Sequence, residues 1–147
     1  MIDNEHYGRL ERMYMSAACN EYYDPKLTVS KGAAEIVIPV QEKFFHAAGA
    51  THGAVYFKAL DDAAFFACNS VVHDFLVLTV TFNVYLIRPV SSGQMKSVGR
   101  VVHASRNLMI AESELLDSKG REIARGNGTF VKSKIRLSPD VGYELSK

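Results

Sequence analysis

Three charged side chains, Lys58, Asp61 and Asp62, stand in the otherwise apolar segment from residue 53 to residue 69, and two of them are carboxylates. A carboxylate on an apolar helix is partly removed from water, which raises its pKa and strengthens it as a base. Gly53 opens the segment, and a helix N-terminus offers unpaired N–H groups to a carbonyl oxygen. Together these groups could hydrolyse a carbonyl compound, which needs an activated nucleophile and donors for an oxyanion.

The two carboxylates, and three polar residues elsewhere in the chain that could join them in a site, also have a plainer structural interpretation. Asp61 and Asp62 could be two solvated carboxylates on an exposed stripe of the helix. Adjacent helical positions point about 100° apart, so at most one of the two need face a given site. His52 fits a helix cap or a core histidine better than proton transfer. His46 fits a site or an ordinary loop equally well, and Thr79 is equally an ordinary β-branched residue of an alternating strand.

The elements around this segment indicate an α+β fold. Residues 53–69 are rich in alanine and lack proline, which favours a helix, and a helix apolar on nearly all sides is buried. Other segments predict a helix at 3–19, a strand at 33–40, a loop at 42–51, four strands at 75–88, 94–105, 107–117 and 121–134, and a peripheral polar tail at 135–147. One buried helix against a curved antiparallel sheet is the expected architecture, as a single domain over 1–147 with its core at about 27–134.

Composition narrows the classes of partner. The 17 basic residues balance 16 acidic ones, so no global field favours nucleic acid or a membrane surface. No signal peptide or membrane span is evident, Cys19 and Cys68 fit buried free thiols, and we expect a soluble cytoplasmic protein without a metal site. Basic residues gather late in the chain and form either a solvated strand face or a local phosphate site: Arg121, Arg125, Lys132, Lys134 and Arg136.

The ten residues from His52 to Asp61, HGAVYFKALD, resemble the HGG…D signature of hotdog thioesterases. The resemblance is to the phenylacetate-degradation type within the 4-hydroxybenzoyl-CoA thioesterase superfamily. Ile87-Arg88-Pro89 is similar to the family's "FLRP" strand end, and residues 117–130 are similar to its D-x-x-G…A…G-T-F ending. The similarity covers about residues 33–134, and the order and spacing of these elements together carry it.

The resemblance implies a hotdog fold and an acyl-CoA thioesterase that releases a free acid and CoA. Asp61 matches the nucleophile or general base, and the N–H of Gly53 matches the donor to the thioester oxygen. Thr79 falls where a Ser or Thr helps to place the attacking water. Two positions depart from the family: His46 stands where many members have Asn, and Ala54 replaces the second glycine of the motif.

The resemblance also implies how substrate and subunits meet. Coenzyme A is part of the substrate, no separate cofactor is expected, and the substrate-binding candidates are His52, Ala54, Arg88, Arg106 and Lys132. A homodimer or homotetramer with shared sites is expected, with Asp61 of one chain working against Gly53 of another. Two alternatives remain: a non-catalytic acyl-CoA-binding hotdog domain, and a hotdog dehydratase, although the 53–69 segment lacks the histidine that dehydratases use.

Overall fold

The computed structural model describes residues 2–145 and has one sheet with a long helix against it. The helices are α1 (Ile2–Ser16), α2 (Asn20–Tyr23) and α3 (Gly53–Asn69), with 3₁₀ turns η1 (Glu42–Phe44) and η2 (Pro139–Val141). The strands are β1 (Lys26–Ser30), β2 (Ala33–Pro39), β3 (Phe75–Leu86), β4 (Gln94–Ala104), β5 (Met109–Leu116) and β6 (Glu122–Arg136). The sheet order is β1-β2-β4-β5-β6-β3, and every neighbouring pair is antiparallel.

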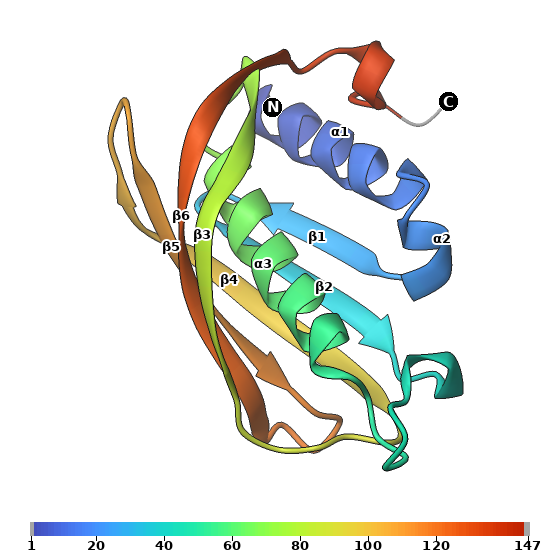
Figure 1. The fold of residues 1–147 in the computed structure, drawn as a ribbon. Coiled ribbons are helices and arrows are strands. Elements are labelled where there is room, and N and C mark those ends of the chain that lie inside the picture. The colour runs from blue at the N-terminus through green and yellow to red at the C-terminus, as the bar shows by residue number, and fades with distance from the viewer. Residues whose placement is uncertain (1, 146–147) are drawn as a thin grey trace.

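The curved sheet wraps around α3, which confirms the predicted α+β architecture (Figure 1). The alanines of α3 that face the sheet are fully buried and let the two backbones approach closely. At Gly99 of β4 the approach is closest, because an added Cβ would collide with the backbone of Ala63. Ser113 of β5 donates a hydrogen bond of 2.8 Å to the carbonyl of Leu60. These contacts fix the position of α3 on the sheet.

Strand β3 lies at one edge of the sheet and pairs only with β6 among the described strands. Its register on β6 shifts between Thr79 and Thr81, which marks a bulge or irregularity next to Thr79. Bulges re-aim side chains next to functional sites. The four predicted long strands are all present, with ends displaced by a few residues, whereas the short strand β1 was not predicted.

The N-terminal helix α1 packs across β1, and the C-terminal segment returns to lie beside it (Figure 1). The helix ends at Ser16 rather than at residue 19, so Cys19 lies in the following turn and is exposed. The prediction that both thiols are buried was therefore wrong for Cys19 and right for Cys68.

The end of the chain is less peripheral than its polar composition predicted. Leu137, Val141 and Tyr143 pack partly buried against the core. The Tyr143 hydroxyl lies 2.6 Å from Nδ1 of the buried His6, whose Nε2 lies 2.8 Å from the carbonyl of Asn69. These contacts connect the C-terminal segment, α1 and the end of α3.

Candidate active site

Asp61 occupies the middle of α3, and its carboxylate is partly buried between the helix and β3. Thr79 donates a hydrogen bond of 2.9 Å to its Oδ1. Burial raises the pKa of Asp61 from its ordinary 3.8 to about 6, because desolvation and the nearby Asp62 outweigh the opposing effects of the Thr79 hydrogen bond and of Lys58. The carboxylate is therefore poised to accept a proton near neutral pH.

A cavity of about 400 Å³ adjoins Asp61 and Thr79. Its other walls are mainly apolar and come from α1, α3, β3 and the C-terminal segment: Met13, Ala17, Phe65, Phe66, Leu76, Leu78 and Val141. The cavity places an apolar space directly against a basic carboxylate. Such a space can hold the hydrocarbon part of a substrate whose carbonyl reaches Asp61.

The neighbouring Asp62 is engaged in a separate polar cluster. Its Oδ2 accepts hydrogen bonds from the Tyr14 hydroxyl at 2.6 Å and from Lys58 Nζ at 2.7 Å. Both partners also line the Asp61 cavity. The interpretation of two solvated carboxylates is therefore wrong, because Asp61 is partly buried against Thr79 and Asp62 is an acceptor in this cluster. No local sequence pattern indicated that Tyr14, 48 residues away, would contact Asp62.

The start of α3 presents one free donor. His52 is the N-cap, and its Nδ1 accepts the N–H of Ala54 at 2.9 Å. No hydrogen bond of the Gly53 N–H is found within residues 2–145. The structure thus gives His52 the cap role, uses the Ala54 N–H within the protein, and leaves the Gly53 N–H available to a ligand.

A second cavity, of about 340 Å³, lies at this helix start and is lined by Gly53, His46, Tyr56, Leu86 and Arg88, among others. The Tyr56 hydroxyl donates a 2.8 Å hydrogen bond to the backbone carbonyl of Arg88. His46 Nδ1 accepts the N–H of Ala48 at 3.1 Å. Two of the predicted residues, His46 and Arg88, are therefore close to Gly53.

The two halves of the predicted site are separate within one chain. Gly53 and Asp61 are eight positions apart on α3, which at 1.5 Å per residue is about 12 Å along the helix axis. They line different cavities. One thioester carbonyl cannot contact both groups of the same chain.

The three basic substrate-binding candidates, Arg88, Arg106 and Lys132, are also far apart within one chain. Lys132 pairs in register with Val77 near the start of β3 and lies 3.3 Å from the carboxylate of Asp74. Arg88 follows the far end of that strand. Arg106 is exposed in the turn between β4 and β5. A single chain therefore does not bring the three cations together.

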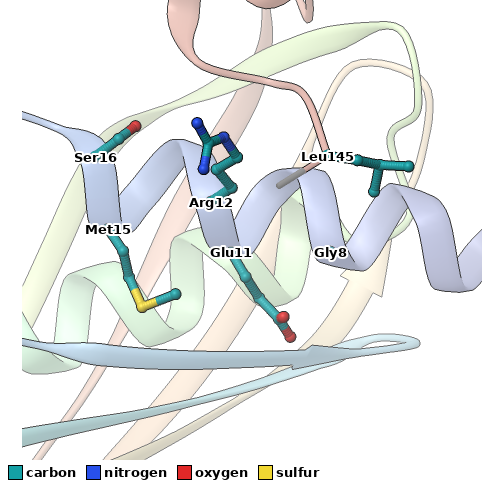
Figure 2. Close-up of a pocket in the computed structure, with 6 residues that line it drawn as sticks. All are labelled: Gly8, Glu11, Arg12, Met15, Ser16 and Leu145. Carbon is teal, nitrogen blue, oxygen red and sulfur yellow. The ribbon is translucent and has the colours of Figure 1, made fainter. Parts of the chain in front are cut away.

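Another cavity, of about 600 Å³, lies between α1 and the C-terminal segment (Figure 2). Its polar side chains have partners: Glu11 accepts the Val29 N–H at 2.9 Å, and Arg12 lies 3.6 Å from Glu144. It is larger than the Asp61 cavity, but Glu11, the carboxylate among its described lining residues, already accepts a hydrogen bond from the backbone of β1. Within residues 2–145 no cluster of three His, Cys, Asp or Glu side chains could hold a metal ion, and no helix is long and apolar enough to cross a membrane.

Comparison with known proteins assigns the class. The thioesterase superfamily model matches residues 48–124, a little over half of the chain, and the protein belongs to this family of hydrolases with the hotdog fold. The family match includes α3, the strands β3, β4 and β5, and the first residues of β6. It supports thioester hydrolysis as the general chemistry of the protein.

Individual solved structures share this fold, and a curated relative is similar in sequence. The PaaI protein of the phenylacetic acid degradation operon of E. coli superposes with a TM-score of 0.85 at 17% identity, over 94% of this chain and 100% of that one. A conserved Pseudomonas aeruginosa protein superposes with a TM-score of 0.77 at 27% identity, over 83% and 98%. A protein of Saccharolobus solfataricus, provisionally named an esterase, is 24% identical over 75% of this chain and 80% of its own length.

Proposed function

We propose that the protein hydrolyses acyl-CoA thioesters, with Asp61 as the nucleophile or as the general base that activates water. The observation that carries this proposal is the Asp61 carboxylate, whose raised pKa and apolar cavity suit it to attack on a bound acyl group. Thr79 orients the carboxylate through its hydrogen bond. The Gly53 N–H donates to the carbonyl oxygen and stabilises the negative charge that develops there.

The 12 Å separation leads us to infer that each site combines Asp61 of one chain with Gly53 of a second copy. A two-fold axis that brings these groups together must pass midway between them on α3, which is at Phe57. On β3, Thr79 contacts Asp61 and Leu86 adjoins Gly53, and the midpoint of those two residues falls beside Phe82.

The two midpoints found in this way lie together in space. The rings of Phe57 and Phe82 are 5.7 Å apart, edge to face. Phe57 is 42% exposed although it is a large apolar residue on a central helix, and exposed Leu78 and Val80 continue the apolar surface along the free edge of β3. An apolar edge strand of this kind favours pairing with another strand. A second copy paired along β3 would cover this surface and complete two sites at once.

The same symmetry gives the predicted CoA ligands a common location. Arg88 lies beside Gly53 of one copy, and Lys132 lies two strand positions from Thr79 of the other. Arginine and lysine at such a junction can bind phosphate through charge-assisted bonds. We propose Arg88 and Lys132 for the phosphates of CoA, with Arg106 as a further candidate, and no separate cofactor. His46, which lines the Gly53 cavity, is proposed to help hold the thioester.

A direct test measures CoA release with a thiol-trapping reagent over straight-chain, branched and aromatic acyl-CoAs. Wild type should turn over at least one class well above background, and Asp61→Asn should lose at least about 100-fold in kcat. Asp140→Asn, which removes an exposed carboxylate on η2, is the matched control. Equal background rates for wild type and Asp61→Asn would favour the binding-only alternative.

Mixing two inactive variants tests whether the site is shared. Gly53→Pro removes the N–H at the first helical position, where proline is tolerated. Co-expression of Asp61→Asn with Gly53→Pro should make mixed dimers in which one of the two sites is intact, so random assembly restores about a quarter of wild-type activity. A site formed within one chain would recover nothing.

A further inference from the structure

Lys58 lies within reach of two carboxylates on the same helix and pairs with only one of them. It precedes Asp61 by three residues and Asp62 by four, and both spacings bring side chains together on a helix surface. Its Nζ lies 2.7 Å from Asp62 Oδ2. Asp61 instead accepts its hydrogen bond from Thr79. The arrangement selects one of two available ion pairs.

Contacts from outside α3 account for this choice. A lysine placed four residues before an acid is the weaker orientation of a helical pair, so the spacing alone favours it little. The Tyr14 hydroxyl donates to the same Asp62 oxygen, at 2.6 Å. The Lys58 ammonium also lies 5.3 Å and 4.8 Å from the ring centres of Tyr14 and Tyr23, within the range of cation–π attraction. Helices α1 and α2 therefore support the Lys58–Asp62 pair.

An ion pair with Lys58 would impair the reactive carboxylate. A lysine ammonium against Asp61 would stabilise its charged form, lower its basicity and occupy the oxygen that must act on substrate. We propose that Asp62, aligned by Tyr14, is a positioning residue that holds Lys58 away from Asp61 and keeps the Asp61 carboxylate free to react. This inference rests on the proposed role of Asp61, and it assigns functions to Asp62, Tyr14 and Lys58 that the thioesterase chemistry alone does not require.

The groups that face Asp61 define what a pH measurement reports. On α3 they are Lys58 and Asp62; α1 contributes Tyr14, the following turn contributes Cys19, and β3 contributes the uncharged Thr79. Asp62 raises the pKa of Asp61 and Lys58 lowers it. Loss of Asp62 therefore acts twice, because it removes a negative neighbour and releases the positive one.

A double-mutant cycle separates this proposal from simple addition of charges. The four proteins are wild type, Asp62→Asn, Lys58→Met and the double variant; asparagine keeps an acceptor for Tyr14 but not the charge that attracts Lys58. The readouts are the pH dependence of kcat and the titration of the Asp61 carboxyl carbon by ¹³C NMR. Thermal unfolding of each variant verifies that the fold is retained.

Asp62→Asn should move the titration of Asp61 to lower pH by about one unit or more and reduce kcat about tenfold. Adding Lys58→Met should restore kcat to within about threefold of wild type. Lys58→Met should also raise the Asp61 titration more in the Asp62→Asn background than in wild type, since only there does Lys58 contact Asp61.

Equal effects of Lys58→Met in the two backgrounds, or a double variant as slow as Asp62→Asn, would overturn the proposal. If Asp62→Asn does not fold, Tyr14→Phe replaces it as the background that weakens the Lys58–Asp62 pair, and the same excess effect of Lys58→Met is required. The NMR titration needs no turnover. An inactive wild type would therefore refute the proposed hydrolase function while the ion-pair cycle still gives its own answer.

Discussion

Replacement of Asp61 by asparagine should stabilise the folded protein at alkaline pH while it abolishes activity. The folded state holds the Asp61 proton more tightly than the unfolded chain does, because burial raises its pKa from 3.8 to about 6. Between these two values the folded state binds more protons, so the free energy of unfolding falls as pH rises. The penalty is absent below about pH 4 and complete above about pH 7. Asparagine removes it and still accepts the Thr79 hydroxyl.

The expected size follows from the shift. A rise of about two pKa units corresponds to about 3 kcal/mol at 1.36 kcal/mol per unit. Asp61 adjoins an open cavity, so water screens part of this penalty, and we expect a gain of about 1–2 kcal/mol at pH 8. With a urea slope of about 2 kcal/mol per molar, the unfolding midpoint should rise by about 0.5–1 M.

Urea unfolding of wild type and Asp61→Asn at pH 4 and pH 8 measures this effect, at one fixed protein concentration because association adds to stability. Asp140→Asn gives the same change of net charge at an exposed position. A stabilisation of equal size at both pH values, or none at pH 8, would show that the Asp61 carboxylate carries no burial penalty. The account of its basicity would then fail as well.

Three further predictions concern the proposed site. Gly53→Pro should reduce kcat at least about 100-fold because it removes the N–H that is proposed to bind the oxyanion. Gly53→Ala keeps this N–H, although its Cβ also meets the Leu86 methyl, and should reduce kcat less than about tenfold. Equal losses of kcat in steady-state assays would exclude the N–H as the important group. Thr79→Val should move the acidic limb of the pH–rate profile, expected near 6 in wild type, to higher pH, because the Thr79 hydrogen bond lowers the pKa of Asp61; an unmoved limb counts against that bond. Phe57→Asp should convert a dimer into a monomer by sedimentation velocity and abolish activity, and a stable, active Phe57→Asp dimer would contradict the symmetry axis at this residue.

The sequence carried enough information to predict the central helix and the strands around it. Residues 53–69 combine many alanines with very few charges, which is typical of a buried helix, and the helix is buried. The strand β1 was not predicted because its five residues, KLTVS, are too few to show a clear period. The predicted first helix ran three residues past the end of α1 at Ser16, because the apolar spacing continues into the following turn, and the burial of Cys19 was wrong for the same reason.

The contacts of the candidate site also differ in how far the sequence could predict them. Asp61 and Thr79 were predicted to belong to one site because both positions fall in a family pattern with fixed spacing, but the hydrogen bond between them was not predicted. The Tyr14–Asp62 contact joins elements that local sequence does not relate, and Tyr14 at helical spacing indicated only an apolar face. The contact between Tyr143 and His6 was not predicted for a similar reason, because the few apolar residues of the polar C-terminal segment show no clear period.

The close packing of Gly99 against the backbone of Ala63 limits which substitutions the centre of the protein can accept. A larger side chain at that contact would collide with the backbone of α3 and displace Asp61, so the position of this carboxylate depends on a contact that leaves no room for an added atom. The walls of its cavity that come from α1 and the C-terminal segment are formed by side chains, among them Met13, Ala17 and Val141, and not by a close contact between two backbones. Divergence of substrate preference among relatives should therefore accumulate at the two ends of the chain, around chemistry held constant at the centre.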